Sequence, residues 1–151
     1  MKKFQFTLQT VHNVREMRQE REETVLAQLN AEAAEARNKV ATIEKNRVEA
    51  YDEYTARLQS GKIDANEMAL TVNYLAALAD YEQNARHSLE QKKKACQRQT
   101  ENVVVAAREV KATNLLRESQ HARYVSQAAR DEQNALDEIN SINFVRKMKQ
   151  L

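Results

Sequence analysis

The chain has no proline and a single glycine, Gly61, in 151 residues. Because glycine and proline end helices and shape turns, their near absence predicts long uninterrupted helices. The one reversal point is Ser60-Gly61-Lys62. It is followed by Asp64 and, three residues later, Glu67, a pair typical of an N-cap with a capping box. The sequence therefore predicts an all-α fold with one helix on each side of Gly61.

Composition fits solvent-exposed helix better than a compact globular domain. Aromatic residues make up 5% of the chain and charged residues 30%, and both charge signs are interspersed, so the net charge is only +2. The single cysteine, Cys96, excludes an intrachain disulfide, and reducing cytoplasm is the default compartment. No apolar run has the length of a signal peptide or a membrane span, so we expect neither secretion by the usual route nor a membrane-spanning helix.

Seam residues recur at the heptad spacing of a coiled coil in both halves of the chain. The first seam is interrupted only by Arg47, and the second by Glu82, Lys92 and Gln99. Members of the first are Leu26, Leu29, Ala33, Ala36, Val40, Ile43, Ala50 and Tyr54. Members of the second are Tyr74 or Leu75, Leu78, Ala85, Leu89, Cys96, Val103, Ala106 and Val110. A third stretch resumes in a shifted phase at Ala122, Val125, Ala129, Glu132, Leu136 and Ile139.

These seams predict a long antiparallel two-helix coiled-coil hairpin that forms a single domain over residues 1–151. The expected bounds are a first helix over about 5–60, a turn over 61–64 and a second helix over about 65–150. Residues 131–141 are a candidate break in the second helix. The C-terminal helical end projects beyond the start of the first helix.

A turn at Gly61 also predicts the register, because the numbers of facing residues should sum to roughly 124. The predicted pairs are Tyr54–Leu70, Ala50–Tyr74, Ile43–Tyr81, Val14–Val110 and Leu8–Leu116.

Large apolar residues are concentrated at the two ends of the chain. Phe4, Leu8 and Val11 share one face of the expected first helix. The C-terminal group comprises Leu136, Ile139, Ile142, Phe144, Val145, Met148 and Leu151. Two interpretations stay open: the ends cap the coiled coil, or they dock into another protein.

Two further clusters have open interpretations. Four tyrosines near Gly61 either pack on one another in a wide seam or contact a partner, since tyrosine suits interfaces. They are Tyr51, Tyr54, Tyr74 and Tyr81. Basic residues over 86–98 form either a solvated helix face or a contact for nucleic acid, an anionic lipid surface or an acidic protein groove. They are Arg86, Lys92, Lys93, Lys94 and Arg98.

The sequence offers no catalytic chemistry. His12, His87 and His121 are widely separated, and no set of His, Cys, Asp and Glu has the spacing of zinc ligands. Phosphate-binding loops need glycines that the chain does not have. We therefore expect no enzyme activity, no metal and no cofactor.

The segment from Met1 to Val11, followed by an Arg/Glu-rich helix, resembles the start of the FliJ family of bacterial flagellar export proteins. Further features are similar in order and spacing, and the resemblance covers essentially the whole chain. They are Tyr51, Tyr54 and Leu58, the lone Gly61, Glu67-Met68, Asn73-Tyr74, and Leu136-Asp137-Glu138-Ile139 with Phe144.

The resemblance implies a cytoplasmic, non-enzymatic component of the flagellar type III export apparatus, peripheral to the inner membrane and needed for flagellum biogenesis, motility and chemotaxis. It implies a stalk-like coiled coil that binds the export ATPase ring and promotes its assembly, docks on the export gate and binds export chaperones. The residues implied to face the ATPase ring are Phe4, Leu8, Val11, Ile139 and Phe144. Those implied to face the gate are Ala50, Tyr54, Ala77 and Tyr81.

Two other functions stay open. The chain could be the corresponding stalk of a virulence type III secretion system, which differs by partner and not by fold. It could instead bind nucleic acid or an anionic membrane surface through the basic cluster from Lys92 to Arg98, which predicts a steep loss of affinity with salt.

Overall fold

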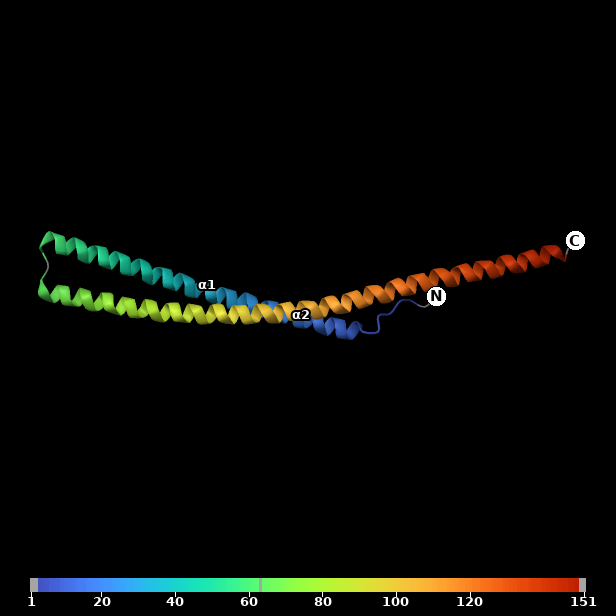
Figure 1. The fold of residues 1–151 in the computed structure, drawn as a ribbon, viewed down its shortest axis with the longest axis horizontal. Coiled ribbons are helices and arrows are strands. Elements are labelled where there is room, and N and C mark those ends of the chain that lie inside the picture. Colours follow the sequence, from blue (N-terminus) through green and yellow to red (C-terminus); the bar gives the residue numbers. More distant parts are fainter. Residues whose placement is uncertain (1–2, 63, 150–151) are drawn as a thin grey trace. The chain divides into compact units, whose positions relative to one another are not determined.

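The near absence of glycine and proline predicts the fold class correctly. A computed structural model describes residues 3–62 and 64–149, and among these residues there are two long helices and no strand. Helix α1 spans Gln9–Ser60 with 52 residues, and α2 spans Ala65–Met148 with 84 residues (Figure 1). The chain is an all-α helical hairpin.

The reversal lies at Gly61, whose φ of 68° is in the left-handed region that glycine enters without a Cβ clash. Its amide donates to the carbonyl of Leu58 at 3.3 Å and so satisfies one of the free carbonyls at the end of α1. Asp64 precedes α2, and its carbonyl accepts from the amide of Met68 at 3.0 Å. The side-chain hydrogen bonds of the predicted capping box are not formed among the described residues, and Ile63 lies outside them.

Contacts divide the chain into two units. The turn unit comprises residues 20–104, and the terminal unit comprises residues 1–19 with 105–151. Each unit contains a segment of α1 and a segment of α2 with buried side chains of its own. The single domain over residues 1–151 stays a prediction.

In the turn unit α1 and α2 lie side by side and antiparallel, and the predicted seams form their interface (Figure 1). Every predicted seam residue from Leu26 to Tyr54 is buried or half-buried except Arg47, and the same holds on α2 from Leu75 to Gln99. The buried apolar residues are Ala33, Val40, Leu78 and Ala85. The heptad pattern therefore identifies the contact line of this unit.

The register of the turn unit follows the prediction closely. Two predicted pairs line common grooves, and they are Ala50–Tyr74 and Ile43–Tyr81. Tyr54 instead shares its groove with Thr71, whereas its predicted partner Leu70 is 70% exposed. The observed partner of Tyr54 lies one residue from the predicted one on α2. A register predicted from summed residue numbers is no more precise than that.

On α1 the terminal unit does not bury the apolar residues that the pattern selects, whereas on α2 the predicted seam residues Ala106 and Val110 are buried. The residues of α1 on the contact line are His12, Arg15 and Gln19, which continue the heptad spacing back from Leu26. Val14 is 60% exposed, so it does not pack on Val110 as predicted. Leu8 and Leu116 are exposed as well, and that pair is also wrong. The heptad spacing continues along α1 in this unit, but polar side chains stand at its contact positions.

Residues 3–8 precede α1 and are not helical, so the first helix starts at Gln9 and not near residue 5. The placement of Phe4, Leu8 and Val11 on one helical face is therefore wrong. Phe6 is buried in this non-helical segment. Burying a phenylalanine contributes about 1.5–3 kcal/mol, which is more than one extra turn at a fraying helix end supplies.

Helix α2 continues to Met148 through residues 131–141, so the candidate break is absent from this described stretch. Every described residue from 129 to 149 is exposed. The C-terminal end of α2 therefore projects without a packing partner among the described residues, as predicted.

The shifted seam starting at Ala122 is not a contact line, because its members are exposed. The buried and half-buried positions of α2 run instead through Thr113, Gln120 and Tyr124. The reason is that the partner changes: α1 begins only at Gln9, and the non-helical residues before it contact α2 here.

Candidate partner-binding surfaces

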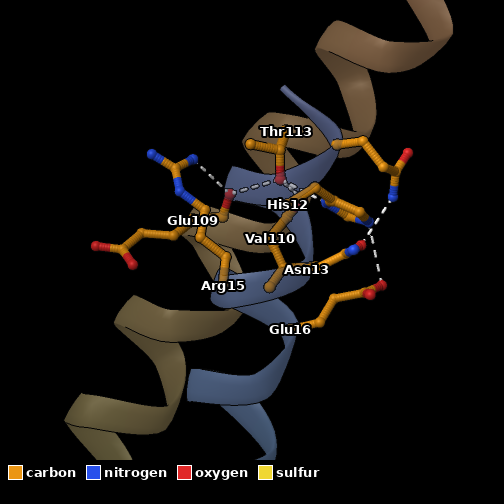
Figure 2. A network of polar contacts seen from close by, with 8 residues as sticks. His12, Asn13, Arg15, Glu16, Glu109, Val110 and Thr113 are labelled. Carbon is orange, nitrogen blue, oxygen red and sulfur yellow. Dashed lines mark hydrogen bonds and ion pairs between the residues drawn. The ribbon is translucent and has the colours of Figure 1, made fainter. Parts of the chain in front are cut away.

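The helix interface of the terminal unit is built around His12, whose side chain is only 2% exposed. In Figure 2 its ring points toward Thr113 of α2, with Glu16 one turn further along α1. The ring Nδ1 lies 2.8 Å from Thr113 Oγ1, and Nε2 lies 3.1 Å from a carboxylate oxygen of Glu16. Both ring nitrogens have partners, as a buried imidazole requires.

Two arginines of α1 contact Glu109 of α2 beside this histidine. Arg15 Nη1 donates to the Glu109 carbonyl at 2.9 Å (Figure 2), and Arg18 Nη1 lies 3.1 Å from its carboxylate. The carboxylate of Glu109 is about a third exposed, so the pair with Arg18 adds little stability. Neutral and charge-assisted hydrogen bonds of this kind each stabilise the terminal unit by about 1 kcal/mol or somewhat more, in addition to the burial of Phe6, Ala106 and Val110.

Large apolar side chains of the terminal unit lie on its outside. Leu8, Val11, Val14 and Met17 are all exposed. Val11 and Val14 line a groove of about 400 Å³ together with Thr10, Arg15, Arg18 and Glu109. Large apolar side chains gathered on the outside of a unit are the arrangement expected of a surface that a partner covers.

The implied ring-facing residues fall into two groups in the structure. Leu8 and Val11 are exposed beside the groove, and Phe4 packs edge-on against His121 with ring centroids 5.0 Å apart. Ile139 and Phe144 lie on the bare end of α2. Because a helix rises about 1.5 Å per residue, Ile139 lies about 27 Å along α2 from His121. The structure does not bring the five residues together into one patch.

Apolar residues on the bare end of α2 recur every third residue. They are Leu136, Ile139, Ile142, Val145 and Met148, all exposed. A step of three residues turns the helix by about 300°, so each member lies about 60° behind the one before. The stripe winds round the helix instead of following one face, and Phe144 adds a further side. Exposed apolar side chains therefore point to several sides of this otherwise polar helix end.

Near the turn, two grooves on one side of the hairpin carry three of the four implied gate-facing residues. Ala50 and Tyr54 line one of about 160 Å³, and Tyr81 lines another of about 410 Å³ with Ile43 and Leu78. Ala77 is exposed four residues before Tyr81, one turn away on the same helix face. These positions are open to a partner.

The tyrosines near Gly61 do not pack on one another. No ring contact joins them among the described residues, and Tyr51, Tyr74 and Tyr81 are all more than half exposed. Tyr51 lines a third groove of about 430 Å³ with Arg47, Val48 and Leu75. The wide-seam interpretation is wrong for these three residues, and the partner interpretation remains.

The basic cluster is partly neutralised by α1. Arg86 contacts Glu82 and Glu44, and Lys92 Nζ lies 3.8 Å from Glu32. The hydrogen bond with the Glu82 carboxylate, together with the charge of Glu44, raises the pKa of Arg86 above its ordinary value. These two cations are held at the helix interface, which reduces the charge that the cluster offers to an anionic partner.

No group of three or more His, Cys, Asp or Glu side chains within residues 3–62 and 64–149 could hold a metal ion. Cys96 is half-buried in the seam. Neither α1 nor α2, over its described length, has an apolar stretch long enough to cross a bilayer.

Comparisons with known proteins agree with the resemblance noted in the sequence. The model of the flagellar FliJ protein family matches residues 4–149. The chain belongs to this family. A solved structure described as that of a YscO homologue from Chlamydia trachomatis is similar to this FliJ family member, with a TM-score of 0.60 and 15% identity. The likeness covers 99% of this chain and 100% of the other, and at that identity it shows the fold alone. No curated protein matches.

Family membership makes the chain a component of the type III export apparatus, in a family that is non-catalytic. The apolar pattern missed the polar residues of α1 on the contact line of the terminal unit. His12, Arg15 and Gln19 stand at the right spacing in the sequence, and extending the heptad backwards from Leu26 regardless of polarity would have found them.

Proposed function

We propose that this FliJ family member is a stalk-like adaptor that binds the ring of the flagellar export ATPase through its terminal unit and docks on the export gate through its turn unit. It promotes assembly of the ring and also binds export chaperones. It reaches the cytoplasmic face of the inner membrane only through these partners.

The observation that carries the proposal is the exposure of large apolar side chains on the terminal unit. Leu8, Val11 and the apolar stripe on 136–148 are exposed, while the polar His12 and Thr113 are buried in the helix interface beside Ala106 and Val110. The winding stripe supports a partner that surrounds the end of α2, as a ring does, because a single helix laid alongside would cover only one face.

A truncation and a point variant test the ATPase contact. Removal of residues 129–151 and the double substitution Ile139→Ser/Phe144→Ser should each weaken binding to the purified export ATPase by at least about tenfold, since buried apolar anchors dominate interface energies. Asn140→Ser/Asn143→Ser is the matched control, because it changes polar residues of the same segment. Unchanged affinity in both test variants would remove the terminal unit as the ATPase site.

The gate contact has its own test. Tyr54→Ala/Tyr81→Ala should lower affinity for the cytoplasmic region of the export gate by about tenfold or more and leave ATPase affinity unchanged. Tyr51→Ala is the matched control, because Tyr51 lines a different groove. Thermal unfolding of each variant separates lost contacts from lost folding. Equal losses in test and control variants would count against a gate surface at Tyr54 and Tyr81.

The virulence-system stalk is the second candidate, favoured by the fold shared with the YscO homologue. The same binding assay with a virulence ATPase in parallel decides between the two systems. Preference for the flagellar ATPase supports the proposal, and preference for the virulence ATPase overturns it.

A further inference from the structure

Two polar residues are buried in the seam of α2 within the turn unit. Glu82 is 6% exposed and Gln99 is 8% exposed. Both stand at heptad positions where an apolar residue would pack without needing a polar partner. A buried carboxylate is costly unless a cation faces it, so its position relative to α1 matters.

Glu82 is contacted from both helices. Its Oε1 accepts from Arg86 Nε at 2.9 Å on its own helix. Its Oε2 is buried and accepts no hydrogen bond, but Arg47 Nη1 of α1 lies 3.0 Å away. This contact with Arg47 is therefore one of charge, without the alignment of a hydrogen bond. Arg86 also contacts Glu44, which lies about one turn before Arg47 on α1.

Gln99 binds α1 at the other end of the same seam. Its Nε2 donates to the backbone carbonyl of Glu22 at 3.0 Å and to the Glu22 carboxylate at 2.5 Å. Its Oε1 accepts from Asn102 at 3.2 Å. The amide is thus satisfied only where Glu22 stands opposite.

The apolar part of the seam does not choose a register by itself. Two of its four buried apolar members, Ala33 and Ala85, offer little shape for a partner to match, and the other two are Val40 and Leu78. Because the seam repeats every seven residues, sliding α2 by one heptad brings seam against seam again.

A slide of one heptad separates every polar pair that joins Glu82 or Gln99 to α1. In one direction Glu82 comes opposite Tyr54 and Gln99 opposite Leu29. In the other direction Glu82 comes opposite Val40 and Arg47 opposite Leu75. Glu82 keeps Arg86 of its own helix but loses Arg47, and Gln99 loses Glu22; the two losses together disfavour such a register by about a hundredfold.

The turn is the rival determinant of register. A slide of one heptad moves the reversal point away from Gly61 by about half a heptad, onto residues that carry a Cβ. Placing a non-glycine residue in the left-handed region disfavours the slide by only about fivefold. The buried polar pairs are the stronger constraint by this comparison.

We propose that the pairs Arg47–Glu82 and Glu22–Gln99 set the register of α1 against α2 in the turn unit. Glu82 and Gln99 are positioning residues: they decide which side chains come together to line the grooves at Tyr54 and Tyr81. The importance of those grooves for the gate rests on the proposed function, whereas the register itself does not.

Disulfide cross-linking in the full chain measures the register. With Cys96→Ser as background, Val40→Cys is paired in turn with Ala85→Cys, Leu78→Cys and Lys92→Cys. Val40 and Ala85 are both buried in the seam, and Ala85 lines a groove with Ala36 and Ile43, which lie about one turn either side of Val40; the other two positions lie one heptad either way. We expect cross-linking to residue 85 alone when the polar pairs are intact.

Replacing the buried polar residues by leucine should release the register. In the variant Arg47→Leu/Glu82→Leu/Gln99→Leu, the share of chains linked at residue 78 or 92 should rise from below about one per cent to at least about ten per cent. Leucine keeps the seam apolar, so the variant is expected to remain folded. Lys45→Leu/Glu49→Leu, which removes an exposed pair on α1, is the control and should leave the pattern unchanged.

Cross-linking to residue 85 alone in the leucine variant would show that the turn or the apolar seam sets the register, and the proposal would be wrong. Binding to the gate fragment is measured on the same variant without the introduced cysteines. A shifted register with lower gate affinity supports the role of Glu82 and Gln99 in positioning the grooves. A shifted register with unchanged affinity overturns the gate site at Tyr54 and Tyr81 and leaves the register inference standing.

Discussion

Thr113→Val tests whether polar contacts hold the terminal unit together. The change removes a hydroxyl that lies 2.8 Å from His12 Nδ1 and 2.9 Å from the carbonyl of Val110, while it keeps a side chain of similar size. The imidazole nitrogen is then buried without a partner, which costs about 1–3 kcal/mol. The carbonyl of Val110 loses its hydrogen bond with the Thr113 hydroxyl but keeps its backbone hydrogen bond within the helix. We expect the free energy of unfolding, measured by urea denaturation and far-ultraviolet circular dichroism, to fall by about 1–3 kcal/mol.

His12→Leu completes a double-mutant cycle. When both partners are apolar no buried group is left unpaired, so the double variant should lose at least about 1 kcal/mol less than the sum of the two single variants. Thr100→Val is the control, because Thr100 is exposed and donates to the carbonyl of Cys96 on its own helix. Its effect should stay within about 0.5 kcal/mol. Additive single effects, or equal effects at Thr113 and Thr100, would refute the reasoning.

Three further predictions concern the turn, the core and the bare helix end. Gly61→Ala should lower the free energy of unfolding by about 1 kcal/mol in urea denaturation, because φ is 68° although an added Cβ would meet no atom within 4 Å. Ala106→Leu should cost about 1–3 kcal/mol in the same assay, because Ala106 is 1% exposed and the larger side chain has no room. Truncation after Ala128 should change the unfolding free energy by less than about 0.5 kcal/mol, because all described residues from 129 to 149 are exposed; a larger loss would mean that this end supports the fold.

The sequence predicted the hairpin well because local and long-range signals agree. With Gly61 as the one helix breaker, the turn could be placed without knowing the tertiary structure. The seam from Leu26 to Tyr54 then matched the buried face of α1, since burial in a two-helix structure depends almost wholly on heptad phase.

The α1 segment of the terminal unit could not be predicted the same way, because its apolar residues are not the ones that are buried. Val11 and Val14 were predicted as contact residues because they are hydrophobic. The side chains that are buried or half-buried are instead those of His12 and Arg15. The start of α1 at Gln9 was also beyond sequence reasoning, since nothing local in the preceding residues opposes helix. The burial of Phe6 in a non-helical segment determines where α1 begins.

Polar interruptions of a heptad seam become informative when they are considered across the two helices together. Arg47 and Glu82 each weaken their own seam, yet their numbers sum to 129, close to the register predicted from the turn alone. His12 and Thr113 sum to 125, and they too are in contact. Because the small alanines of the seam fit many alignments of the two helices, its buried polar residues do most to determine which alignment forms. If that argument holds, the register of this hairpin depends more on its few buried polar contacts than on the apolar residues between them.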